Sequence, residues 1–232
     1  MKASFWTELL DIISPRQCAI CGERLSATEQ VICGACHLQL PLTHYEQSPL
    51  DNPLARLFWG LFPVERAAAF FFYEPQSAAS HLVYSMKYFG RREVAEAMGT
   101  IIARRFSAAG FFDGIDILLP MPITRRRRWQ RDYNQSHELA RGISQVSALP
   151  IDGHVVKRVS FTQSQTTRHA WERLHGVDNA FRLVKPEAIA NRHVLLIDDI
   201  VTTGATISSC ARELAKAPGV RISVLALGVT RS

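Results

Sequence analysis

The stretch that decides the fold is His193-Val-Leu-Leu-Ile-Asp-Asp-Ile-Val-Thr-Thr-Gly-Ala-Thr206. Its apolar run, 194–197, is typical of a short strand that is buried on both faces. Two acids, Asp198 and Asp199, end that strand, and the loop 202–206 opens a helix expected over 207–216. A strand tip, two carboxylates and a loop at a helix N-terminus can together hold a sugar phosphate.

The loop, Thr202-Thr203-Gly204-Ala205-Thr206, has the chemistry of a phosphate site. Backbone amides and the positive end of the helix favour an anion, and the threonine hydroxyls add donors. Gly204 permits a positive φ and lets the backbone approach the anion closely. The two acids can accept hydrogen bonds from vicinal ribose hydroxyls and lie near a bound Mg²⁺. The alternative is a plain strand-to-helix turn in which aspartate and threonine are helix caps.

A second anion site is indicated further back in the chain. A strand expected over 116–119 leads into the turn at Met121 and Pro122, and five arginines follow at 125–128 and 131. Guanidinium groups bind phosphate oxygens in a bidentate manner, so part of this cluster is a candidate pyrophosphate anchor. The net charge of +6 and the pI near 9.3 leave nucleic acid open as a partner, with Trp129 and Tyr133 as stacking platforms. A solvated basic face is the third interpretation.

Four of the five cysteines form two CxxC knuckles, Cys18 with Cys21 and Cys33 with Cys36. This spacing favours a zinc ribbon with one structural Zn²⁺ per chain, since so short a segment cannot bury a core of its own. Two disulfides, a haem attachment sequence at 33–37 and a redox pair are the alternatives. The fifth cysteine, Cys210, is expected in the core.

The remaining pattern divides the chain into three regions. An amphipathic helix and the ribbon occupy 1–40, a connector 41–63 and an α/β domain 64–232, with apolar side chains at 57–62 expected on the domain surface or in a crevice. Helices are expected over 77–89, capped by Ser77, over 91–106 and from about 134 to 147; further strands are expected at 67–73, 155–159 and 222–227. Lys87, at the end of the first of these helices, either binds helix carbonyls or binds a ligand.

The polar segment 160–176 is too long for an ordinary loop and is typical of a lid. No apolar run approaches the ~20 residues of a transmembrane helix, and residues 1–15 lack a signal-peptide core. The sequence therefore predicts a cytoplasmic protein that does not bind a membrane.

The stretch 194–206 resembles the PRPP-binding motif of type I phosphoribosyltransferases, where PRPP is 5-phosphoribosyl 1-pyrophosphate. Together with the paired knuckles and the segment Arg131-Asp-Tyr-Asn-Gln-Ser136, it makes the chain similar to ComF/GntX-type proteins. These are double-zinc-ribbon, phosphoribosyltransferase-like proteins linked in some bacteria to natural competence, the uptake of DNA. The implied fold is a type I phosphoribosyltransferase-like parallel sheet flanked by helices, with a small N-terminal four-cysteine zinc ribbon.

The resemblance also implies roles for single residues. Asp198 and Asp199 would hold the ribose hydroxyls as the catalytic acids, and the loop 202–206 the 5-phosphate. Mg²⁺-pyrophosphate would lie on a loop made of Met121, Pro122, Arg126, Arg128 and Arg131. The lid would use Thr162, Gln165 and Arg173. Such proteins usually have glycine where this chain has Asp132, whose charge would oppose pyrophosphate.

Three functions follow from these features. The first is a Mg²⁺-dependent phosphoribosyltransferase, a glycosyltransferase whose acceptor the sequence does not reveal. The second is a PRPP- or nucleotide-binding protein without turnover. The third is a nucleic-acid-associated competence factor that uses its ribbon and arginines to bind single-stranded DNA or a protein of the competence machinery.

Overall fold

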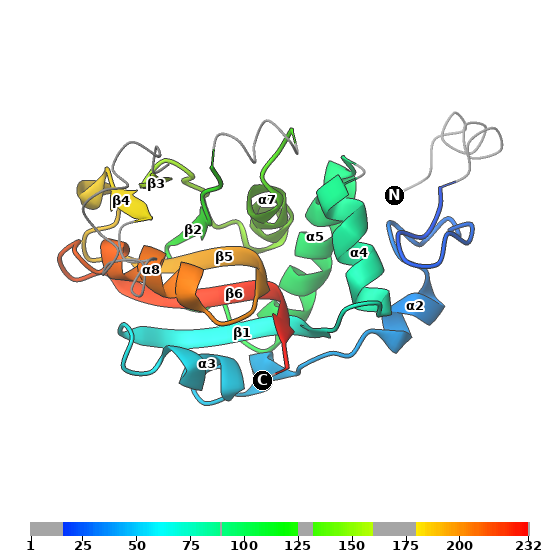
Figure 1. Ribbon diagram of the computed structural model, residues 1–232, viewed down its shortest axis with the longest axis horizontal. Coiled ribbons are helices and arrows are strands. Elements are labelled where there is room, and N and C mark those ends of the chain that lie inside the picture. The colour runs from blue at the N-terminus through cyan, green and yellow to red at the C-terminus, as the bar shows by residue number, and fades with distance from the viewer. Residues whose placement is uncertain (1–15, 89, 125–131, 160–179, 232) are drawn as a thin grey trace, which may run out of the picture.

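The computed structural model describes residues 16–88, 90–124, 132–159 and 180–231. Its centre is a four-stranded parallel sheet in the order β1-β6-β5-β2. The strands are β1 (Val64–Tyr73), β2 (Ile117–Pro120), β5 (His193–Val201) and β6 (Arg221–Thr230). Helices cover this sheet (Figure 1), so the α/β class with a parallel sheet is confirmed.

Strand β5 is longer than its apolar run. It continues through both acids to Val201, whereas the sequence indicated that the acids end it. The reason is its neighbour β6, which runs alongside and pairs with Asp198 at Ala226 and with Val201 at Val229. Backbone pairing therefore continues where apolar side chains have already stopped, and it fixes the backbone of both acids.

The alternating side chains of the strands build two cores. Leu195 and Ile197 point to one face, and Val194 and Leu196 to the other. The first face packs against α4 (Ala78–Tyr88), α5 (Arg92–Ala108) and α7 (Gln135–Ser147). The second packs against α3 (Pro53–Phe58) and α8 (Ala205–Leu214). Helix α8 begins two residues before the expected start, because Gly204 is its N-cap.

Helices α5 and α7 touch at two glycines. A Cβ on Gly99 would lie 2.2 Å from the Leu139 carbonyl oxygen, and one on Gly142 would lie 1.8 Å from the Glu96 carbonyl oxygen. Only glycine allows this approach, which seats α7 against β2 and β5. The N-terminus of α7 is thereby held at the carboxyl end of the sheet.

The segment expected to be a connector, 41–63, packs on the sheet. It contains a 3-10 turn, Tyr45–Gln47, and helix α3, which Asn52 caps by accepting from the Leu54 and Ala55 amides. Phe58 and Phe62 are buried in the second core, whereas Trp59 and Leu61 are exposed as expected. The apolar pattern of the sequence did not distinguish the buried side chains from the exposed ones. The three regions 1–40, 41–63 and 64–232 remain a prediction.

The other described elements are short. Strands β3 (Val156–Arg158) and β4 (Phe181–Leu183) form an antiparallel pair beside α8, a 3-10 turn spans Pro186–Ala188, and α2 (Gly34–Gln39) follows the second knuckle. Within the described ranges, no helix is both long enough and apolar enough to cross a bilayer. The expected N-terminal helix lies outside these ranges, as do Arg126, Arg128, Arg131, Thr162, Gln165 and Arg173.

Candidate functional site: a cleft at the carboxyl edge of the sheet

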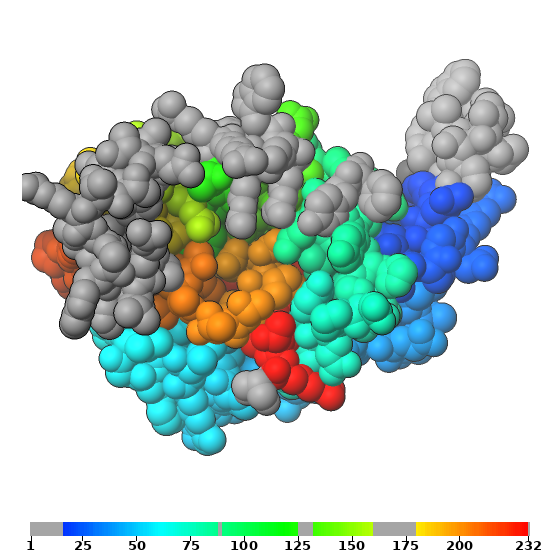
Figure 2. Space-filling model, in the orientation of Figure 1, coloured from blue at the N-terminus to red at the C-terminus, as the bar shows by residue number. Residues whose placement is uncertain are grey.

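A cleft lies where the chain changes direction in the sheet. From β5 the chain crosses through α8 to β6 on one side, while β2 lies on the other side of β5. Parallel sheets open a crevice at such a switch point, at the carboxyl ends of the strands. In Figure 2 the orange atoms of β5 and α8 reach the surface between the cyan β1–α3 region and the turquoise α4 region.

The cleft has a volume of about 360 Å³ and draws its walls from distant parts of the chain. Strands β1, β3 and β5, helices α4, α7 and α8, and the loops that follow β2 and β5 all contribute. The lining residues are Tyr73, Lys87, Met121, Pro122, Ile123, Gln135, Ser136, Arg158, Asp198, Asp199, Ile200, Thr202 and Thr206. Several of the residues predicted to bind PRPP therefore share one cleft.

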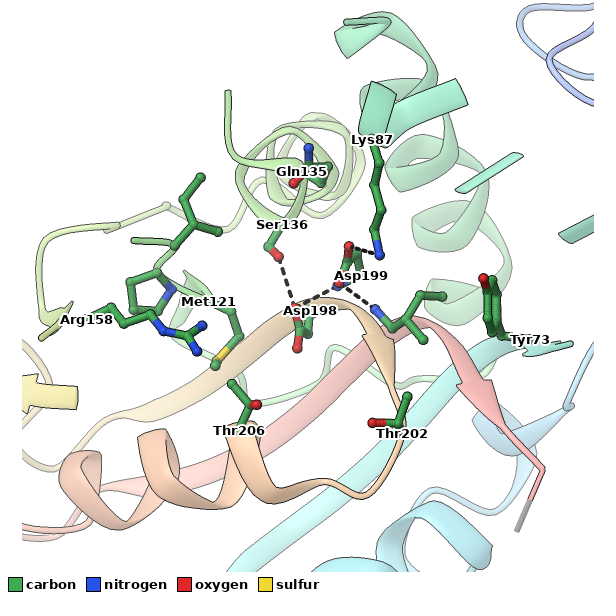
Figure 3. Close-up of a pocket in the computed structure, with 13 residues that line it drawn as sticks. Tyr73, Lys87, Met121, Gln135, Ser136, Arg158, Asp198, Asp199, Thr202 and Thr206 are labelled. Carbon is green, nitrogen blue, oxygen red and sulfur yellow. Dashed lines mark hydrogen bonds and ion pairs between the residues drawn. The ribbon is translucent and has the colours of Figure 1, made fainter. Parts of the chain in front are cut away.

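The two acids lie in its centre (Figure 3). Asp198 Oδ1 accepts from the Ser136 hydroxyl at 3.2 Å and from the Asp199 amide at 2.9 Å, and Asp199 Oδ1 accepts from the Ile200 amide at 2.8 Å. Burial and the Asp199 carboxylate raise the pKa of Asp198 to about 8. Two adjacent carboxylates in a shielded cleft repel each other, so a cation or a hydrogen-bond donor is favoured there.

The threonine loop forms the opposite wall. Gly204 has the positive φ that the sequence predicted, +71°, and helix α8 starts at the next residue. Thr202 and Thr206 line the cleft, so the N-terminus of α8 is directed at it (Figure 3). The first amides of a helix lack partners within that helix, which makes this wall suitable for an anion.

The base of the arginine loop is held firmly. The Asn134 side chain donates to the Met121 carbonyl at 2.9 Å and accepts from the Ser136 amide at 3.2 Å, which ties the Met121 turn to the start of α7. The Tyr133 hydroxyl donates to the Met86 carbonyl, and burial raises its pKa to about 12. Tyr133 is only 4% exposed, so the suggestion that it stacks on nucleic acid is wrong; Trp129 lies outside the described residues.

Asp132 does not carry a lone charge toward the cleft. Its carboxylate is 90% exposed and lies 2.6 Å from the guanidinium of Arg92. The same guanidinium lies 5.4 Å from the centre of the Tyr133 ring. The departure from the usual glycine is therefore offset by an arginine of α5.

Sequence patterns missed several lining residues. Tyr73 is the last residue of β1, Ser136 lies in the first turn of α7, and Arg158 lies over the Phe181 ring of the neighbouring strand. Their common signal is position, since each lies at or near the end of an element that points to the same sheet edge. Without the strand order that signal could not be used.

The four cysteines of the two knuckles meet in a separate cluster. Their sulfurs lie within 4.8 Å of one another, and Cys21 and Cys33 are 3.8 Å apart. Four sulfurs around one Zn²⁺ would be about 3.8 Å apart, because Zn–S bonds are about 2.3 Å long. All five cysteines of the chain are free, so the disulfide alternative is not borne out. The cluster could hold a zinc ion.

Backbone amides already prepare the cluster for a cation. Burial opposes ionisation of Cys18, but hydrogen bonds from the backbone of Cys21, Cys33 and Ile20 lower the pKa of its thiol to about 7. Burial and the neighbouring sulfurs raise the pKa of Cys36. The thiolate is the form of cysteine that binds a metal ion, so the backbone around Cys18 favours the form that a ligand needs.

Fold and site define an α/β protein with an acidic, hydroxyl-lined cleft at the edge of a parallel sheet and a four-cysteine cluster near its N-terminus. The chain is 29% identical to the DNA utilization protein YhgH of Escherichia coli K12, over 90% of this chain and 88% of that protein. It is 34% identical to competence protein F of Haemophilus influenzae over 44% of each chain, and 29% identical to competence protein ComFC of Bacillus subtilis over 63% and 57%. The chain is thus a relative of ComF-type proteins, as its motifs predicted.

No family model matches the chain. Among solved structures, a hypoxanthine phosphoribosyltransferase of Staphylococcus aureus is similar at a TM-score of 0.35 and 16% identity, over 58% of this chain and 62% of that one. The hypoxanthine phosphoribosyltransferase of Trypanosoma cruzi is similar at a TM-score of 0.36 and 13% identity, over 63% and 76%.

Proposed function

We propose that the cleft binds PRPP together with Mg²⁺, and that the protein serves DNA uptake or utilization as a phosphoribosyltransferase-like protein. One observation carries this proposal: two adjacent carboxylates and the N-terminus of α8 face each other across a single cleft at the carboxyl edge of the sheet. The carboxylates suit a ribose diol and a divalent cation, and the helix end suits a phosphate. PRPP with its Mg²⁺ carries a ribose diol, a divalent cation and a 5-phosphate.

Each wall then has one task. The loop 202–206 holds the 5-phosphate, Asp198 and Asp199 accept from the ribose hydroxyls, and the Met121–Pro122 turn supports pyrophosphate with Arg126, Arg128 and Arg131. Carboxylate oxygens are ligands that Mg²⁺ prefers, so the donor set fits. Bound there, Mg²⁺ would neutralise charge on the pyrophosphate.

Turnover requires no nucleophile from the protein. Pyrophosphate leaves C1 of the ribose through an oxocarbenium-like state, and the acceptor takes its place. The chain contributes positioning and electrostatic stabilisation, and a lid with Thr162, Gln165 and Arg173 would exclude water. If no acceptor is used, the same contacts make a PRPP sensor.

Calorimetry tests the binding step. Wild-type protein should bind PRPP in the presence of Mg²⁺ and more weakly without it. The double variant Asp198→Asn, Asp199→Asn should lose at least ~100-fold in affinity, because it removes two charged acceptors. Asp51→Asn is the matched control, since Asp51 pairs with Arg56 on the exposed side of α3. Unchanged affinity in the double variant would contradict the site.

A pyrophosphate-release assay with a panel of bases and amines separates enzyme from sensor. Release that depends on the acceptor indicates a transferase. Binding without release in every reaction of the panel favours the sensor.

DNA association is the second candidate, supported by the names of similar proteins, DNA utilization protein and competence protein. Single-stranded DNA binding should weaken as salt rises and when Arg126 to Arg128 are replaced. Absent or salt-independent binding would count against it.

We also propose that the ion of the cysteine cluster is a structural Zn²⁺, one per chain. The close approach of all four sulfurs, within 4.8 Å of one another, supports it. Metal analysis should find one zinc per chain.

A further inference from the structure

Lys87 is the residue that the proposed function leaves unexplained. It lies near the C-terminal end of α4, and its ammonium Nζ reaches Asp199 Oδ2 at 2.9 Å. The two side chains are only 21% and 18% exposed. Figure 3 shows the lysine crossing from α4 into the cleft, so of its two predicted roles the structure favours ligand contact over capping of helix carbonyls.

This ion pair competes with any ligand of Asp199. One oxygen of that carboxylate already accepts from the Ile200 amide, and the other faces Lys87. A ribose diol or a cation that approaches Asp199 therefore meets the ammonium first. An ammonium displaced inside a shielded cleft needs a new anion, since leaving it unpaired is costly.

The backbone around Lys87 is tied to the predicted pyrophosphate loop. Met86, its neighbour, accepts from the Tyr133 hydroxyl, and Arg92 of α5 donates to the Asp132 carbonyl oxygen at 3.0 Å. Asn134 then binds the Met121 carbonyl. One chain of contacts thus connects the backbone around Lys87 with the Met121 turn.

The threonine loop lies at the other end. In Figure 3, Thr202 and Thr206 lie on the opposite side of the two acids from Lys87. If the loop takes the 5-phosphate, an anion beside Lys87 must belong to the other end of the sugar. The cleft therefore has two possible anion subsites, with the acidic pair between them.

We propose that Lys87 forms a second anion subsite that is closed by its own ion pair: a ligand opens the Lys87–Asp199 pair by supplying a sugar diol or cation to Asp199 and an anionic group to Lys87. This deepens the proposed function and rests on it. A ligand with only one phosphate breaks the pair without replacing it. Lys87 thus selects sugars that carry anions at both ends over simple sugar phosphates.

Calorimetry at fixed Mg²⁺ with two probes, PRPP and ribose 5-phosphate, tests the subsite. In Lys87→Met the PRPP affinity should fall roughly 10- to 100-fold, the range for one lost charged hydrogen bond. Ribose 5-phosphate should bind equally well or more tightly, because Asp199 no longer has a competitor. Lys87→Arg should keep most of the preference for PRPP. Lys216→Met is the matched control, because Lys216 is exposed beyond the far end of α8.

The ratio of the two affinities decides the outcome. An equal loss for both probes, or no loss for either, overturns the role of Lys87 while PRPP binding by the wild type still stands. Absence of PRPP binding in the wild type overturns both proposals. If Lys87→Met does not fold, Lys87→Gln carries the same test, since it keeps a donor for Asp199 but no charge, and the same ratio is measured.

Discussion

The cysteine cluster and the sheet-edge cleft both gather ionisable side chains, but by opposite means. The cysteines come from one short segment, 18–36, and local turns bring their sulfurs together. The cleft takes its residues from six helices and strands and from two loops, spread between Tyr73 and Thr206. The first kind is formed by local turns and by the burial of Leu25, Val31 and Ile32 beside the sulfurs, whereas the second is held by the cores on both faces of the sheet.

The difference is also electrostatic. In the cysteine cluster, burial and the three neighbouring sulfurs oppose ionisation of Cys36 and raise its pKa. In the cleft, Lys87 already neutralises Asp199. The cleft therefore pairs one of its two acids with a cationic side chain, whereas the crowded thiols would be relieved by a bound cation.

The largest effect should come from removing the cysteines. In the double variant Cys18→Ser, Cys33→Ser the metal site is lost, and with it several kcal/mol of local stability (about 5), because metal binding and folding of such a segment are coupled. Limited proteolysis should then cut within 16–40 and leave the sheet intact. Metal content is measured in parallel.

Cys210→Ala is the matched control for that variant, since Cys210 is buried in α8 far from the knuckles. It should keep both the metal and the resistance of 16–40 to protease. Equal resistance in the double variant would show that the segment folds without its ion.

A smaller effect is expected at Gly204, where long-range packing shapes the threonine loop. Its φ is +71°, and a Cβ would lie 2.8 Å from Phe58 Cε1 and 3.0 Å from Leu57 Cδ2. Gly204→Ala should therefore destabilise the protein by about 2–4 kcal/mol, from the backbone strain and the clash together. Chemical denaturation measures it, and PRPP affinity should fall as well.

Gly114→Ala separates these two causes. Gly114 has the same φ, +71°, but a Cβ there would meet nothing within 4 Å. It should cost only the backbone term, about 1–2 kcal/mol. If both variants lose the same stability, the contact of the loop with α3 contributes nothing.

The same contrast explains what the sequence could predict. The spacing of the cysteines and the run 194–206 each lie within one local segment, so residue type and order were enough to place them. Lys87, Ser136 and Arg158 enter the cleft only because the strand order brings their elements to one edge, and strand order depends on pairing across more than a hundred residues. The burial of Phe58 and Phe62 was missed for the same reason, since their contacts lie on a sheet whose other strands come much later in the chain.

A still smaller effect is expected at Asp198, whose ionisation makes the stability of the protein depend on pH. Its pKa is about 8 in the folded protein, compared with the ordinary 3.8. Between about pH 4 and about pH 8 the carboxyl is therefore ionised in the unfolded chain but protonated in the folded one, and the free energy of unfolding falls as the pH rises through this range. Asp198→Asn keeps the Oδ1 acceptor and removes the charge. It should stabilise the protein by about 1–3 kcal/mol at pH 8 and have little effect near pH 4.

Denaturation curves at several pH values measure this, with Asp51→Asn for comparison. The Arg56 guanidinium lowers the pKa of Asp51, so that variant should show the opposite sign. If Asp198→Asn stabilised the protein equally at every pH, the fold would not disfavour the ionised form of Asp198.

The smallest effect is expected at Asp132, which tests whether an exposed charge near the cleft matters at all. Because Arg92 already neutralises it and exposed pairs contribute little, Asp132→Gly should shift the melting temperature by no more than a degree or two. Pyrophosphate affinity, measured by calorimetry with Mg²⁺, should stay within about twofold. Arg92→Ala is the matched variant. It leaves the Asp132 charge unpaired and removes the guanidinium that lies over the Tyr133 ring. It should therefore change the affinity for pyrophosphate more than Asp132→Gly does, and in the direction of weaker binding. A tenfold gain in pyrophosphate affinity in Asp132→Gly would instead mean that the Asp132 carboxylate repels the bound anion despite its pairing with Arg92. Surface charge would then set the affinity of the cleft together with the packing of the core.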